Sequence, residues 1–127
     1  MILVTLLVSA ALTIPVSIDH AGPDLDGRTV ERLTLAQKRA AARSLISSAN
    51  ECIASAVATD PRFGKTANAG DINDLIVESV PSCLDAVRTM IEGHDRLFGQ
   101  GSGESFFTGP YLDALPDAVH GLMQRAR

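Results

Sequence analysis

The cluster His94-Asp95-Arg96, followed by glycines at positions 99, 101 and 103, contains residue types that could do chemistry. A histidine beside a carboxylate can act as a general base, and glycine-rich turns can present backbone N–H groups to an anion. Adjacent residues on a helix point about 100° apart, so Asp95 does not naturally orient His94. The glycines match neither phosphate-loop pattern. We favour a core or boundary histidine, and keep a small hydrolase that uses His94, Asp95 and Glu104 as an alternative.

Cys52 and Cys83 form the second pair with possible chemistry, because each falls on the apolar stripe of a predicted helix. In an antiparallel hairpin their distances from the connecting loop differ by roughly 7 Å, which an asymmetric loop can absorb. Exported proteins pass through an oxidising compartment. We predict a Cys52–Cys83 disulfide, with two buried free thiols as the alternative.

A histidine–aspartate pair on a disulfide-bonded helix resembles the secreted phospholipases A2 in that one feature. The flanking cysteines and the calcium-binding glycine loop of that family have no counterpart here, so its activity is not carried over. His20, His94 and His120 are far apart in the sequence and have no metal-ligand spacing. We therefore predict no metal, no cofactor and no assigned catalytic residue.

The first element that must position these residues is a long helix over about 30–59. Apolar residues recur there at three- and four-residue steps, which is typical of an amphipathic helix. Thr34 and Gln37 form a capping-box pattern that would start the helix at Leu35 instead. The helix must end at Asp60-Pro61, because proline disfavours a helical conformation in the residue before it.

A second helical stripe runs over about 71–98 and keeps its phase through Pro81. We predict a kink at Pro81, with a break into two helices as the alternative. Residues 99–104 suggest a flexible connector, and Pro116 is expected to open a last helix. No strand-like alternation is visible. The predicted fold is all-α: a disulfide-stapled long helical hairpin plus one or two short C-terminal helices.

The 127 residues fit one domain preceded by a targeting segment. Residues 1–18 contain no charged side chain, and charge begins at Asp19. We interpret 1–18 as a signal peptide, with a short membrane anchor or a first core helix as alternatives. Cleavage would leave a mature chain that begins between residues 12 and 22. Residues 19–28 are then a flexible leader and 29–127 a single helical domain.

Charge is unevenly distributed along the chain, whose net charge is -4. This balance argues against nucleic-acid binding. Residues 28–43 carry five basic residues against one acidic residue, whereas 71–95 carry six acidic residues against one basic residue. Lys38, Arg39 and Arg43 are candidates for docking an acidic partner or an anionic membrane surface. The alternative is a pair of solvated faces with rim ion pairs.

Four of the five aromatic residues fall within residues 98–111. They can close the open side of the hairpin, because two helices alone cannot bury both apolar stripes. Alternatively, Phe107 and Tyr111 could anchor a partner.

The function predicted from these features is a small exported, non-enzymatic helical protein in a bacterial periplasm or secreted. It would bind another envelope or secreted protein, or protect a surface. A membrane-anchored envelope protein, held only through residues 1–18, and the hydrolase of His94 and Asp95 are the alternatives. Acid-stress chaperones and immunity proteins are analogies at the level of fold alone.

Overall fold

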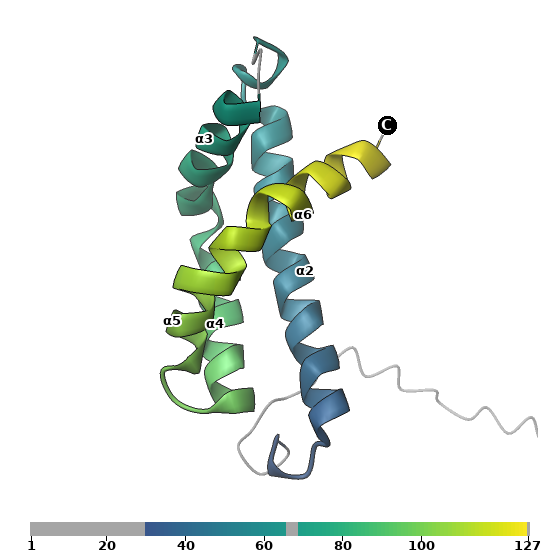
Figure 1. The fold of residues 1–127 in the computed structure, drawn as a ribbon, viewed down its shortest axis with the longest axis vertical. Helices are drawn as coiled ribbons and strands as arrows, with labels where there is room; N and C mark the ends of the chain where they lie inside the picture. The colour runs from purple at the N-terminus through teal and green to yellow at the C-terminus, as the bar shows by residue number, and fades with distance from the viewer. Residues whose placement is uncertain (1–29, 66–68, 127) are drawn as a thin grey trace, which may run out of the picture.

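The computed structural model describes residues 30–65 and 69–126, in which all regular structure is helical (Figure 1). The predicted signal peptide and leader, residues 1–28, lie outside the described residues. Within the described ranges, no helix is both long enough and apolar enough to cross a membrane. The predicted all-α hairpin is confirmed.

The first long helix, α2, spans Leu35–Thr59, so the later of the two predicted starts is right. The backbone N–H of Gln37 donates to the Thr34 hydroxyl at 3.2 Å, and the backbone N–H of Thr34 donates to the Gln37 side-chain carbonyl at 2.8 Å. This reciprocal pair satisfies two N–H groups that the first helical turn leaves free. The helix ends before Asp60-Pro61, as proline requires.

The second arm of the hairpin consists of α3 (Ala69–Ser79), a 3-10 turn η2 (Val80–Cys83) and α4 (Leu84–Phe98). Proline has no backbone N–H, and its ring collides with the carbonyl four residues earlier in an α-helix. Around Pro81 the chain adopts the tighter 3-10 conformation of η2, and the α-helix resumes at Leu84. The arm therefore runs from α3 to α4 with a local change of helix type.

The C-terminal part is more helical than the glycine and proline pattern indicates. Only 99–101 separate α4 from α5 (Ser102–Phe106), so the predicted flexible connector over 99–104 is too long. The predicted break at Gly109-Pro110 is replaced by a π-helical turn, η3 (Phe107–Tyr111), which absorbs Pro110. The last helix, α6 (Leu112–Arg125), begins four residues before Pro116.

The helices pack as a hairpin with a crossing helix. In Figure 1, α3 and α4 run alongside α2, and α6 crosses in front of α2 at a steep angle. The main core lies where these four helices meet. Its buried side chains come from all of these helices: Ala49, Ile53, Val57, Leu75, Ile76, Val87, Met90, Leu115 and Val119. α6 thus covers the apolar stripes that the hairpin leaves open.

The apolar stripes are predicted well in the middle of the helices and poorly at their ends. Ala36 and Ala40 are exposed, whereas Ala42 is buried against Leu97. Alanine is compatible with either environment, so a run of alanines does not fix which face points inward.

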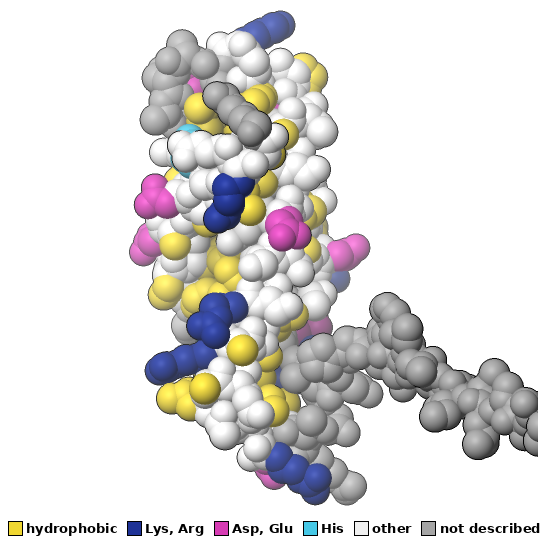
Figure 2. Space-filling view, turned by 90° about the vertical axis from the view of Figure 1, so that its right-hand side faces the viewer, with side chains coloured by type: hydrophobic (Ala, Val, Ile, Leu, Met, Phe, Trp, Pro, Cys, Tyr) yellow, Lys and Arg dark blue, Asp and Glu magenta, His cyan; other side chains and the backbone are white. Residues whose placement is uncertain are grey.

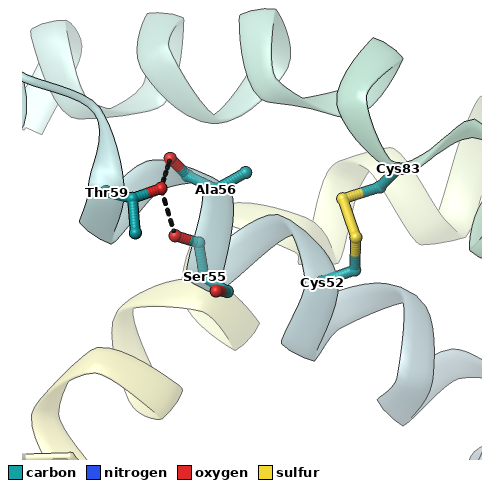
Figure 3. The surroundings of a disulfide bond; sticks show 5 residues. All are labelled: Cys52, Ser55, Ala56, Thr59 and Cys83. Carbon is teal, nitrogen blue, oxygen red and sulfur yellow. Dashed lines mark hydrogen bonds between the residues drawn. A yellow bond between two sulfur atoms is a disulfide. The ribbon is translucent and has the colours of Figure 1, made fainter.

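The predicted disulfide is present. Figure 3 shows Cys52 of α2 facing Cys83 of η2; the sulfur atoms are 2.10 Å apart and the Cα atoms 6.0 Å apart. Cys83 is 3% exposed and belongs to the main core. Closer to the end of α2, the Thr59 hydroxyl donates to the carbonyl oxygens of Ser55 and Ala56 at 3.0 and 3.2 Å.

Candidate functional site

His94 lies where α4 turns into α5, with Ser102 opposite. Its Nδ1 is 2.8 Å from the Ser102 hydroxyl oxygen, and the same hydroxyl donates to the His94 carbonyl oxygen at 3.2 Å. A hydroxyl has a single proton. While that proton points to the carbonyl, Nδ1 must be the protonated ring nitrogen and must donate to Ser102. In this arrangement the His94 ring donates a hydrogen bond to Ser102, so Nδ1 cannot act as the base that deprotonates the Ser102 hydroxyl.

The His94 ring is half-buried among aromatic side chains. It stacks on Phe106 with the ring centres 4.8 Å apart and the planes 11° apart, and it meets Phe98 at 4.7 Å in a tilted contact. Burial lowers the pKa of His94, and the nearby Asp95 carboxylate opposes that shift. The neutral imidazole therefore predominates near neutral pH, in agreement with the boundary histidine favoured from the sequence.

Asp95 contacts the next residue of α5 at the same corner. Its carboxylate accepts the Gly103 backbone N–H at 2.7 Å, so it caps the start of α5. A Cβ at Gly103 would overlap the Ile91 carbonyl oxygen. Gly101 adopts φ +84°, a backbone conformation that side chains disfavour. The histidine–aspartate pair and the glycines thus build one tight helix corner.

This corner has one feature of a hydrolase and lacks others. A serine within hydrogen-bond distance of a histidine is the arrangement that activates a nucleophile. The Asp95 carboxylate, however, occupies the N–H group of Gly103 that could otherwise stabilise an oxyanion. Within the described residues, no hydrogen bond joins the exposed Glu104 carboxylate to His94. Sequence reasoning missed Ser102, because it interpreted Gly101-Ser102-Gly103 as a linker.

An apolar groove of about 280 Å³ opens at the other end of the hairpin, between α2, α6 and the 3-10 turn η1 (Phe63–Lys65). Small residues of α2 form its floor, and half-buried side chains of η1 and α6 form its walls. Its lining is Ala54, Ser55, Ala58, Phe63, Leu122, Met123 and Ala126. None of these residues is charged, and sequence reasoning did not find the groove. Its only sequence signal is the small-residue spacing Ala54–Ala58, which a helix places on one face.

A charged cluster lies on the α3 side of the same end. Arg62 pairs with Asp60 at 3.0 Å and with Glu78 at 2.6 Å. Its hydrogen bonds lower the pKa of Asp60 below the usual range. These pairs are exposed and therefore contribute little to stability. They join the loop after α2 to α3.

The two aromatic anchors proposed from the sequence are brought together, but mostly inside the molecule. Tyr111 is 3% exposed, and Phe107 is half-buried and stacked on it with ring centres 5.6 Å apart. Burial raises the pKa of Tyr111 to about 12. Both rings pack against the main core, as expected for closure of the hairpin. Tyr111 therefore has almost no surface to offer a partner, and binding by Phe107 stays a prediction.

The basic residues proposed from the sequence are all on the N-terminal half of α2. Arg39 and Arg43 are exposed and Lys38 is half-buried. Among the described residues, no carboxylate lies within ion-pair distance of these three side chains. The rim ion pairs considered as an alternative are therefore not made by them to any described residue.

No family model matches the chain, and comparisons with curated proteins and with solved structures find no similar protein. In the part of the chain that the structure describes, no group of three His, Cys, Asp or Glu side chains could hold a metal ion.

Proposed function

We propose that this protein is an exported, non-enzymatic helical module that binds another envelope or secreted protein in the groove between α2 and α6. The groove is the observation that carries the proposal. Its volume of about 280 Å³ is just below the range of small-molecule ligand pockets, roughly 300–1,000 Å³. An uncharged apolar recess of that size suits one or two apolar side chains of a partner helix, the recognition mode of helix-in-groove complexes.

The disulfide supports the exported location. Such bonds persist in the periplasm and outside cells, and are rare in a reducing cytosol. The uncharged segment 1–18 supports the same location through its resemblance in composition to a signal peptide. N-terminal sequencing of the protein purified from its native source should find a mature chain that begins between residues 12 and 22. An unprocessed chain recovered from membranes would favour the anchored alternative.

A photo-crosslinking amino acid placed at Ala58 tests the groove in the native source. We expect a discrete adduct with a partner from this position and none from Thr89, which is exposed on α4 and distant from the groove lining. Met123→Glu puts a charge into the groove and should abolish the adduct. Gln124→Glu adds the same charge to the exposed neighbouring residue and should preserve it. Equal adducts from Ala58 and Thr89, or an adduct that survives Met123→Glu, would contradict the proposal.

The hydrolase alternative rests on one observation, the 2.8 Å contact between His94 and Ser102, and it requires the Ser102 hydroxyl to turn from the His94 carbonyl oxygen towards Nδ1. Its test is ester hydrolysis by the purified full chain, compared with Ser102→Ala and His94→Gln variants. The alternative requires an activity that both substitutions abolish. The groove proposal expects no activity that depends on either residue.

A further inference from the structure

The end of the bundle opposite the groove combines exposed basic and apolar side chains. Leu35 is 56% exposed at the start of α2, and the half-buried Lys38 and the exposed Arg39 and Arg43 follow it within the next eight residues. From residue 35 to residue 50 the chain contains no acidic residue. In Figure 2, Lys and Arg side chains lie beside hydrophobic side chains in the lower part of the face shown.

The last turn of α4 lies at the same end of the bundle. Ala42 of α2 packs with Leu97, and a Cβ on Gly93 would collide with Leu45. This register places the last turn of α4 beside the turn of α2 that carries Arg43, one turn after Lys38 and Arg39. Phe98, which is 39% exposed, and the exposed Arg96 belong to that last turn. We call Leu35, Lys38, Arg39, Arg43, Arg96 and Phe98 the basic end.

The electrostatic field at the basic end is positive for a second reason. The first turn of α2 contains no acidic residue, and its cap is the neutral pair Thr34 and Gln37. The positive end of the helix dipole is therefore uncompensated, and it adds to the field of the three basic side chains. The exposed carboxylates of this region, Glu31 and Glu104, are on other elements.

We infer that the basic end docks on an anionic phospholipid bilayer. Lipid headgroups attract exposed Lys and Arg side chains, and the interface accepts apolar side chains such as Leu35 and Phe98 at the same time. In the anchored alternative, in which residues 1–18 are retained, residues 19–29 alone would connect that segment to Val30, which packs with Leu97 at this end.

The test compares binding of the full chain to vesicles of pure phosphatidylcholine and to vesicles that contain about one-third phosphatidylglycerol. Any insertion of residues 1–18 contributes to binding to both kinds of vesicle. The ratio of the two binding affinities therefore isolates the electrostatic contribution. Each basic side chain near an anionic surface strengthens binding about fivefold. The variant Lys38→Glu/Arg39→Glu/Arg43→Glu should therefore reduce the preference for anionic vesicles by at least about 100-fold, the loss of three positive charges, and further through the carboxylates it introduces. Salt at about 1 M should remove the preference of the unmodified chain, because the Debye length falls to about 3 Å.

A matched control reverses three exposed basic residues elsewhere, Lys65, Arg88 and Arg125, and so changes the net charge equally. This variant should keep most of the lipid preference. Circular dichroism melting verifies that both variants fold. Equal binding of the unmodified chain to the two lipids would overturn the inference, as would an equal loss in the control. Binding to polyglutamate in place of anionic vesicles would assign the basic end to an acidic protein instead.

Discussion

Removal of the Cys52–Cys83 disulfide should cost this protein a large share of its stability. The bond joins residues 31 apart in sequence. In the chain-entropy model a closed loop of that length stabilises the folded state by roughly 3.7 kcal/mol at 25 °C, because it restricts the unfolded chain. Small domains are stable by only about 5–15 kcal/mol, so the bond supplies between a quarter and most of the total. For a domain of about 100 residues this corresponds to a fall of about 15–30 °C in melting temperature.

The measurement is thermal unfolding of the full chain by circular dichroism, with and without a thiol reductant. Cys52→Ala/Cys83→Ala serves as the comparison, since alanine leaves no unsatisfied hydroxyl at the buried Cys83 position. The reductant should lower the melting temperature of the unmodified protein towards that of the double variant, and it should leave the variant unchanged. A reductant effect of less than about 3 °C on a protein whose bond is shown to be reduced would refute the loop-entropy reasoning.

Four further outcomes are expected. Gly103→Ala should destabilise by about 3 kcal/mol, because the new Cβ overlaps the Ile91 carbonyl, whereas Gly121→Ala, with open space around it, should stabilise by about 0.5–1 kcal/mol in urea unfolding. Thr34→Ala removes the α2 cap and should cost about 1 kcal/mol in the same measurement. Because the pKa of His94 is lowered in the folded chain, the unfolded chain binds this proton more tightly. The contribution of the neutral His94 to stability is therefore present above about pH 6.5 and is lost as the pH falls through the pKa of the folded chain. His94→Gln should remove this part of the pH dependence when the free energy of unfolding is measured by urea titration at several pH values. Tyr111→Phe should melt no lower than the unmodified protein, because the buried Tyr111 hydroxyl has no hydrogen-bond partner among the described residues.

The hairpin and its disulfide could be predicted because both depend on periodicity. The spacing of apolar residues fixes which face of each helix is buried, and Asp60-Pro61 fixes where the chain must turn. Once the two stripes face each other, Cys52 and Cys83 are restricted to the same seam. Their confirmed pairing needs no information about the detailed packing.

The corner between α4 and α5 could not be predicted, because tertiary contacts there override local propensity. Glycines at 99, 101 and 103 indicate a flexible loop. In the folded chain the Asp95 carboxylate supplies the cap that α5 needs, and Gly103 is the residue small enough to pass beneath the Ile91 carbonyl. Both contacts join residues eight or more positions apart, which a pattern over neighbouring residues does not register. The same applies to the π-helical turn around Pro110, which depends on the packing of Tyr111 in the core.

The groove and the basic end are far enough apart to act independently. Along α2, Ala54 lies fifteen residues beyond Arg39, which corresponds to about 22 Å of helix. Variants separated by more than about 7–10 Å generally have additive effects. A chain docked on a bilayer by its basic end would hold the groove some 20 Å above the headgroups, where a partner helix in solution can reach it. Met123→Glu should therefore leave vesicle binding unchanged, and reversal of the three α2 charges should leave the crosslink at Ala58 unchanged for a partner that is not itself membrane-bound. Loss of both activities in either variant would mean that the two surfaces form a single interface.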